Sequence, residues 1–239
     1  MGPKHSGRAG RWGIRIDFPI KPIAVIPARD AASTVGDVVR GLRAALPGAE
    51  VVVVDDGSTD ATGERAREAG AIVARHEQNR GKGAALETGF DVALARGADA
   101  VLALDADGQH DPALAPRLLG ALADADVVIG SREGDRAGMP WIRRATNDVT
   151  TWFVSKLAGQ RIHDSQSGFR AIRAEVLRRV RPESRRFEYE SEFLIGAAKA
   201  GFRIGAAPVS TLYNAPGSHI HPFRDTVRFI RLVLRHLGK

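Results

Sequence analysis

Short apolar runs alternate with segments of helical periodicity through the first half of the chain. Five runs are predicted strands, at residues 23–26, 51–54, 71–74, 100–104 and 127–129. Helices are predicted at residues 33–46, in a segment that ends at residue 69, and at residues 83–95 and 112–122. Strands that are apolar throughout and separated by helices are typical of a parallel sheet covered on both faces. We therefore expect an α/β fold with a mostly parallel, Rossmann-like central sheet flanked by helices.

Beyond Gly130 this alternation breaks. A loop rich in Gly and Arg, residues 131–140, precedes a predicted helix at residues 141–157. Further helices are predicted at residues 174–180 and 189–200, a strand pair at 202–206 and 209–213, and a final helix from about Pro222. The first half has the pattern of a nucleotide-binding half-domain, and the second half is expected to meet the other substrate.

The 239 residues fit one folded domain, predicted at residues 21–215. Residues 1–20 are expected to form a disordered basic tail, and residues 216–239 a loop and a C-terminal amphipathic helix. The tail lacks the apolar core of a secretory signal. No apolar run approaches the roughly 20 residues of a membrane-spanning helix. These features predict a cytoplasmic protein.

Composition narrows the range of partners. The net charge of +7 favours anionic partners, and the absence of cysteine excludes disulfides and thiolate metal sites. Aromatic residues make up only 6% of the chain and are not interleaved with the basic residues. A protein that binds single-stranded nucleic acid uses such aromatics for stacking, so nucleic acid is not an expected partner.

Polar clusters follow three of the predicted strands, where an open parallel sheet binds its ligands. Pro27 and Ala28 follow the first strand, and Asp55 and Asp56 follow the second. Asp60 of the GSTD turn is expected to cap the next helix. In the sequence DADGQH, Asp105 and Asp107 leave the fourth strand with Gln109 two residues further on. Two carboxylates and an amide oxygen suit a hard divalent cation such as Mg²⁺ or Mn²⁺, with phosphates completing its coordination.

Lys82 lies in the sequence NRGKG at the start of a predicted helix. Small residues at a helix N-terminus favour a bound phosphate, and lysine adds a point charge. An ordinary helix start is the alternative interpretation, and the pattern of a P-loop is absent.

The ordered motifs IPARD, VVVVDDGSTD, NRGKGAAL, ALDADGQHDP, GSR and SGFR resemble those of family-2 glycosyltransferases of the GT-A fold. The resemblance runs from about Pro22 to Tyr213. It is strongest to the branch that contains dolichol-phosphate mannosyltransferase and the bacterial polyprenyl-phosphate glycosyltransferases. It implies an inverting, metal-dependent transfer from a nucleotide sugar of the GDP-mannose or UDP-glucose type.

The resemblance also implies a role for individual residues. Pro27, Ala28 and Asp55 would bind the nucleoside, and Asp56 and Lys82 would lie near the donor. Asp30 stands at a donor-side position where such proteins often carry glutamate. Asp105, Asp107 and Gln109 would hold the metal at the diphosphate. Asp107 is assigned to catalysis together with Arg132 and Arg170, which would face the acceptor.

Three hypotheses about the function remain open, two of which differ in the acceptor. A polyprenyl phosphate is already largely ionised at neutral pH and needs no general base. A hydroxyl of a saccharide or small metabolite would need one, for which Glu188, Glu190 and Glu192 are candidates. A sensor that binds nucleotide sugars without turnover is the third. A sugar nucleotidyltransferase is disfavoured because IPARD lacks a Gly-rich loop, and a haloacid-dehalogenase phosphatase because DADGQ lies at mid-chain.

Two features near the C-terminus remain ambiguous. His219 in APGSHIHP is a candidate donor contact, and His221 a weaker one; His110 and His163 are expected to make only loop contacts. Apolar and arginine side chains alternate at helical spacing after Pro222. This helix either lies on an anionic membrane surface at the inner face of the cell membrane or packs on the domain.

Overall fold

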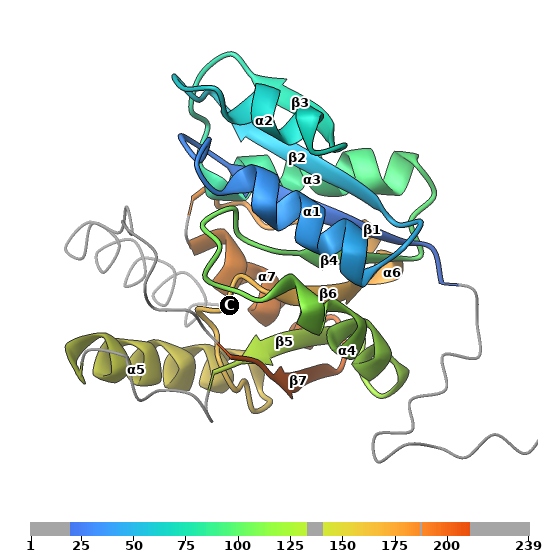
Figure 1. The fold of residues 1–239 in the computed structure, drawn as a ribbon. Coiled ribbons are helices and arrows are strands. Elements are labelled where there is room, and N and C mark those ends of the chain that lie inside the picture. Colours follow the sequence, from blue (N-terminus) through green and yellow to red (C-terminus); the bar gives the residue numbers. More distant parts are fainter. Residues whose placement is uncertain (1–19, 133–140, 187, 211–239) are drawn as a thin grey trace, which may run out of the picture.

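In the computed structural model, a single sheet of seven strands forms the centre of the molecule (Figure 1). The structure describes residues 20–132, 141–186 and 188–210. The strands are ordered β3-β2-β1-β4-β6-β5-β7 across the sheet. Their bounds are β1 Pro22–Ala28, β2 Glu50–Asp56, β3 Ile72–His76, β4 Ala100–Ala103, β5 Val127–Ser131, β6 Arg170–Arg173 and β7 Ile204–Pro208. The expected α/β fold with a mostly parallel sheet is confirmed.

The first four strands run parallel, because β1 pairs in parallel with both β2 and β4, and β2 pairs in parallel with β3. Strand β6 lies antiparallel between β4 and β5, and β7 extends the sheet parallel to β5. Strand β6 was not predicted from the sequence. Its four residues, RAIR, carry an arginine at each end and form no apolar run.

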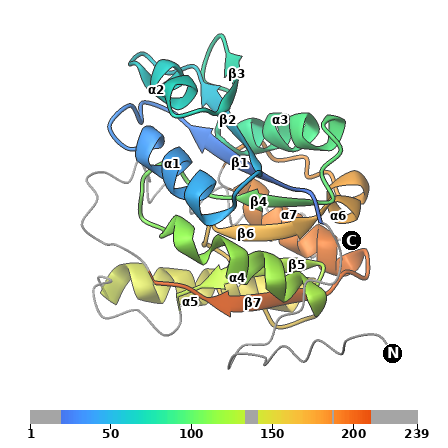
Figure 2. The same cartoon turned by 45° about the vertical axis from the view of Figure 1, so that its right-hand side comes forward.

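Helices cover both faces of the sheet (Figure 2). Their bounds are α1 Val35–Ala45, α2 Thr62–Glu68, α3 Lys82–Ala95, α4 Ala115–Gly120, α5 Trp141–Ala158, α6 Ala174–Arg179 and α7 Glu188–Lys199. Alternate side chains of β1 and β2 enter two cores: one is shared with α1, α2 and α4, and the other with α3, α5, α6 and α7. The period of two along each strand explains this division.

Helix α3 approaches the sheet closely. A Cβ atom at Gly89 would lie 2.3 Å from Cγ1 of Val25 on β1, closer than real Cβ contacts. Glycine at this position therefore lets α3, which begins at Lys82, pack directly against β1 and β2. This packing fixes where the N-terminus of the helix lies.

Two predicted elements differ from the structure. The helix expected at residues 112–122 is divided into a 3₁₀ turn η1 Pro112–Leu114, helix α4, and a second 3₁₀ turn η2 Ala121–Ala123. Pro112 and Pro116 each lie in the first turn of a separate helical piece, which explains the division. Of the expected strand pair, the structure describes one strand, β7, and residues 209 and 210 are not part of a strand.

Several predictions concern residues outside the described ranges. These are the basic tail up to residue 19, the end of the second predicted strand at residues 211–213, His219 and His221, and the C-terminal helix. Among the helices that the structure describes, none is long and apolar enough to cross a membrane.

Candidate active site

The carboxyl ends of β1, β2 and β4 meet at one edge of the sheet. Ala28 is in register with Asp55, and Asp105 follows β4, which pairs with β1 on its other side. The residues that the sequence predicts to bind the nucleoside, the diphosphate and the metal therefore lie at the same edge of the sheet. Pro27 is half-buried and Ala28 is buried at this edge.

Hydrogen bonds join the loops after β1 and β2. The Asp30 carboxylate accepts hydrogen bonds from the backbone N–H and the hydroxyl of Thr59, and its own N–H donates to Ser58 Oγ at 3.0 Å. Asp30 has a φ of 48°, a left-handed conformation that aspartate tolerates better than most residues. The carboxylate predicted to contact the donor is therefore bound to the neighbouring loop.

Asp60 also joins these loops and does not act as the N-cap of α2. The helix begins at Thr62, and its N-cap residue is Ala61, with no side-chain cap bond. Oδ1 of Asp60 accepts the Thr62 N–H at 3.0 Å, and Oδ2 accepts the Ala32 N–H at 3.1 Å. The prediction of a helix cap is thus corrected to a bridge between two loops.

Asp55 is fully buried beneath this edge. Its Oδ1 accepts the Ser58 N–H at 2.9 Å. Arg75 Nη1 lies 3.3 Å from Oδ2, an ion pair without hydrogen-bond geometry, so Oδ2 has no hydrogen-bond partner among the described residues. A buried carboxylate oxygen normally has such a partner. Oδ2 is the atom of Asp55 that is left for a ligand donor group.

Asp56 organises the loop that leads to Lys82. It accepts the backbone N–H groups of Arg80 and Gly81, each at 2.8 Å. His76 Nδ1 lies 2.7 Å from the same carboxylate, and His76 Nε2 lies 3.0 Å from Thr88 Oγ1 on α3. Because Asp56 is buried and its bonds point into the protein, it positions the helix start.

Lys82 lies between two carboxylates. Its Nζ is 2.8 Å and 3.1 Å from the two oxygens of Asp105 and 3.0 Å from Oε2 of Glu190. Burial would lower the pKa of Lys82, but these two carboxylates raise it above its ordinary value. The lysine is therefore a fixed positive charge at the end of β4.

The two aspartates of DADGQH have pKa values shifted in opposite directions. Burial would raise the pKa of Asp105, but the Lys82 ammonium lowers it below its usual value. The pKa of Asp107 is raised by burial and by the negative charge of Asp105. The Asp107 carboxylate accepts the Gln109 backbone N–H at 3.0 Å. A cation bound to both carboxylates would relieve the repulsion between them.

This donor set fits a magnesium or manganese ion that also binds substrate phosphate. Within the described part of the chain, no three His, Asp or Glu side chains are grouped to hold a metal. Mg²⁺ is usually held by one or two protein carboxylates and completed by water and phosphate oxygens. Asp105 and Asp107 supply two carboxylates, and the amide oxygen of Gln109 would be the third protein ligand, as predicted from the sequence.

His110 was underestimated in the sequence analysis, which expected only a loop contact. Its ring is buried 5.5 Å from the ring of Phe169, and its Nδ1 has no hydrogen-bond partner among the described residues. Burial lowers the pKa of His110. Its place directly after DADGQ was the only signal in the sequence. It joins the candidate site as a neutral ring beside the two aspartates.

The SGFR segment forms the wall of the site next to Asp105. A Cβ atom at Gly168 would lie 2.3 Å from Asp105 Oδ2 and 2.9 Å from Oδ1. Only a residue without a side chain leaves room for the carboxylate here. The glycine of this motif is therefore explained by the aspartate at the end of the neighbouring strand.

The Arg170 guanidinium is bound within the protein. Arg170 is buried, and its guanidinium donates to the backbone carbonyls of Ser165, Ser167 and Glu190 at 2.8–3.0 Å. These bonds tie the SGFR loop to α7. The contacts therefore favour a positioning role over the predicted contact with the acceptor.

Arg132 at the end of β5 forms a bidentate pair with Asp164. Its Nε and Nη2 lie 2.7 Å and 2.9 Å from the two carboxylate oxygens, and Asn147 of α5 lies 3.4 Å from one of them. Both partners are buried. The pair joins β5, α5 and the segment before β6 on the predicted acceptor side.

We expect Asp164→Asn to lower the free energy of unfolding by about 3 kcal/mol, because it removes the negative charge from the buried bidentate pair with Arg132. Burial would raise the pKa of Asp164, but Arg132 lowers it below the usual value. The pair therefore stabilises the fold above the unfolded pKa of about 3.9, and this stability is lost as the pH falls toward the folded pKa. Urea unfolding at several pH values measures this. A variant as stable as the wild type at pH 7 would contradict the prediction.

The three glutamates considered as bases differ in their surroundings. Glu192 accepts the backbone N–H groups of Glu183 and Ser184 at 3.1 Å and 3.0 Å. Glu190 pairs with Lys82. Glu188 has a buried Oε2 without a hydrogen-bond partner among the described residues. Glu192 therefore holds the loop before α7, which leaves Glu188 and Glu190 as candidates.

The motif order and the edge geometry agree with a comparison to known families. The model of glycosyl transferase family 2 matches residues 23–181. The chain belongs to glycosyl transferase family 2. It is a glycosyltransferase, and the resemblance noted in its motifs is confirmed.

Named relatives of this family-2 enzyme act on lipid phosphates. The undecaprenyl-phosphate mannosyltransferase of Micrococcus luteus is 32% identical over 202 residues, which cover 80% of this chain and 83% of the relative. The UDP-N-acetylglucosamine–dolichyl-phosphate N-acetylglucosaminyltransferase of Methanococcus voltae is 30% identical, with 90% and 96% covered.

A solved structure shares the fold of this family-2 chain. Glucosyl-3-phosphoglycerate synthase from Mycobacterium tuberculosis, crystallised with Mn²⁺, UDP and phosphoglyceric acid, has a TM-score of 0.68 at 22% identity. The match covers 92% of this chain and 78% of the synthase. This likeness confirms the GT-A architecture.

Proposed function

We propose that this family-2 enzyme transfers a sugar from a nucleotide-sugar donor to a polyprenyl phosphate, with inversion at the anomeric carbon. The observation that carries the proposal is the group of Asp105, Asp107 and Lys82 at the sheet edge, together with relatives named for lipid-phosphate acceptors. The donor is of the GDP-mannose or UDP-glucose type.

The donor would lie across the carboxyl ends of β1, β2 and β4. Oδ2 of Asp55, which is ion-paired with Arg75 but has no hydrogen-bond partner among the described residues, is the atom that would accept a hydrogen bond from the nucleoside. Asp105, Asp107 and Gln109 would hold Mg²⁺ or Mn²⁺ at the diphosphate. When bound, such an ion supplies positive charge that stabilises the departing diphosphate. Lys82 adds a second positive charge at the same place, which the protein holds fixed before the reaction.

The acceptor would approach from the side of β5 and β6. A lipid phosphate has a second pKa of about 6 and is already ionised at neutral pH. Its oxygen can attack the anomeric carbon directly, so no side chain needs to remove a proton. Arg132, fixed by Asp164, supplies positive charge on this side. Arg170 and Gly168 shape the wall that lies against Asp105.

A transfer assay tests the proposal. UDP- and GDP-sugars are screened with Mg²⁺ or Mn²⁺, with and without a short polyprenyl phosphate, and Asp107→Ala serves as the control. We expect metal-dependent product only with the lipid phosphate, and a loss of about 10²-fold or more in the variant. Transfer to a soluble hydroxyl, or donor binding without transfer, would contradict the proposed acceptor. Failure to bind any nucleotide sugar would contradict the proposal as a whole.

A further inference from the structure

The outward face of α5 exposes apolar side chains. Val149 and Trp152 are each 56% exposed, and within the described part of the chain they are the large apolar side chains that are exposed. They lie three residues apart and so share one side of the helix, which Lys156 continues one turn later. The opposite side, with Asn147, Val154 and Ala158, is buried. We define Val149, Trp152 and Lys156 as the α5 face.

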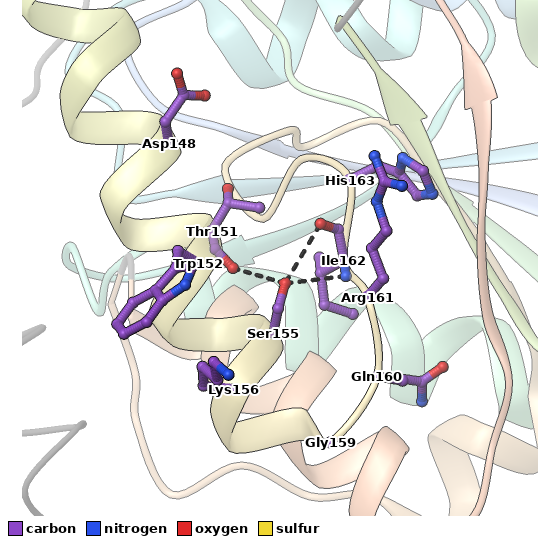
Figure 3. A pocket seen from close by; sticks show the side chains of 10 residues that line it. All are labelled: Asp148, Thr151, Trp152, Ser155, Lys156, Gly159, Gln160, Arg161, Ile162 and His163. Atoms are coloured by element: carbon purple, nitrogen blue, oxygen red, sulfur yellow. Dashed lines mark hydrogen bonds between the residues drawn. The ribbon is translucent and has the colours of Figure 1, made fainter.

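A hollow of about 580 Å³ lies beside this face (Figure 3). Side chains of α5 and of residues 159–163 line it. Ser155 holds the two segments together, because its hydroxyl oxygen accepts the Ile162 N–H at 3.0 Å. Lys156 and Arg161 at the hollow are exposed, and the Lys156 ammonium lies 5.8 Å from the centre of the Trp152 ring. Asp148 is the one acidic residue of the lining.

An exposed tryptophan beside cationic side chains is the chemistry of a membrane-interface anchor. Tryptophan lies at the level of the headgroups, and lysine or arginine pairs with anionic lipids there. The hollow also lies close to the acceptor side, since Asp164, the partner of Arg132, directly follows His163 of its lining. We propose that the α5 face and this hollow form the surface by which the protein binds an anionic lipid bilayer.

This docking surface deepens the proposed function, because a lipid-phosphate acceptor is held in a bilayer. It is tested by flotation of the full chain with vesicles of phosphatidylcholine and phosphatidylglycerol. We expect Val149→Glu/Trp152→Glu to weaken binding on the order of tenfold or more, because both changes place negative charge in the interface. Arg40→Glu on α1, an exposed charge reversal elsewhere, is the matched control and should bind nearly as the wild type does.

Three outcomes would overturn the docking surface: no vesicle binding by the wild type, equal binding by the double variant, or a change in oligomeric state as the only effect of the double substitution. Circular dichroism checks that the variants fold. Transfer to a short polyprenyl phosphate in detergent separates docking from catalysis. The double variant should retain this transfer, whereas a wild type that binds vesicles but transfers no sugar contradicts only the proposed function.

The proposed cation site already contains a positive charge, the Lys82 ammonium. The Lys82 ammonium contacts both oxygens of Asp105, the carboxylate that the proposed function assigns to a divalent ion, and it also contacts Glu190. Arg170 Nη2 lies 3.8 Å from the other oxygen of Glu190. Two cations cannot share one carboxylate closely without repulsion. We infer that Lys82 competes with the metal for Asp105, and that Glu190 is the positioning residue that keeps Lys82 neutralised when Asp105 binds the metal.

Two substitutions should act in opposite directions on Mn²⁺ affinity, measured from the free-ion signal in electron paramagnetic resonance without nucleotide. Lys82→Met frees Asp105 and should tighten binding, on the order of tenfold. Glu190→Gln leaves Lys82 with Asp105 alone and should weaken binding several-fold. Lys156→Met, an exposed lysine changed in the same way, is the control and should match the wild type. A general loss of structure would weaken binding in both site variants.

Unchanged or weaker Mn²⁺ binding by Lys82→Met would overturn this competition, as would tighter binding by Glu190→Gln. The inference rests on the metal dependence of the proposed function. The transfer assay on the same preparations separates the two. Wild-type protein that transfers sugar with Mn²⁺, but whose affinities do not move in opposite directions, contradicts the competition alone.

Discussion

Asp105→Asn is expected to lower kcat/KM for sugar transfer on the order of 10³-fold, the largest effect we predict for a single substitution. The change removes the charge that faces Lys82 at 2.8 Å and takes a carboxylate from the proposed cation site. Lys82 keeps Glu190 as its partner, so the fold should survive. Steady-state kinetics with the donor and acceptor found in the screen provide the measurement.

Asp124→Asn is the control for this loss. Asp124 is exposed and precedes β5, so it lies at the opposite end of that strand from Arg132. The Asp124→Asn enzyme should keep an activity within about twofold of the wild type, because surface substitutions rarely disturb a distant site. An Asp105→Asn enzyme with near-normal kcat/KM, folded by circular dichroism, would remove Asp105 from the mechanism.

Gly168→Ala is expected to cost about 10²-fold in activity through a single added methyl group. The new Cβ would lie 2.3 Å from Asp105 Oδ2, so the carboxylate or the SGFR loop must move. Such overpacking also destabilises a fold by about 1–3 kcal/mol. Activity at saturating donor and urea unfolding separate the two effects.

Gly36→Ala in α1 is the matched control for this substitution. Its added Cβ would meet only the flexible end of Arg40, at 3.3 Å. Alanine is a better helix former than glycine and the added methyl group meets no rigid neighbour, so this variant should be at least as stable as the wild type, with full activity. Gly168→Ala with unchanged activity would mean that Asp105 has room to move without consequence.

The parallel part of the sheet could be predicted from the sequence because its strands are buried on both faces. The run VVVVDD shows both the strand and the carboxylates that end it, and the structure places Asp55 and Asp56 at the end of β2. Asp105 and Asp107 were found in the same way. For such strands, the place where the apolar run stops marks the edge of the sheet where ligands bind.

The partners of the predicted residues could not be inferred in this way. Nothing in SGFR indicates that the Arg170 guanidinium donates to three backbone carbonyls. Two of these carbonyls lie in the loop before β6, and the third lies on α7, which is distant in the sequence. Strand β6 is short and flanked by arginines, so it has no apolar run to mark it. The burial of His110 against Phe169 depends on a strand pairing far along the chain.

The antiparallel placement of β6 has a consequence for how this enzyme can diversify. The chain leaves the sheet at the end of β5 and returns at the start of β6, and these two points lie at the same edge because the strands run in opposite directions. Residues 132–169 therefore form an excursion whose two ends both lie at this edge of the sheet. Under the proposed function, such a segment can be exchanged as a cassette between related enzymes without altering the strands β1, β2 and β4, to which we assign the donor. Acceptor preference would then change by transplantation of one contiguous stretch of sequence.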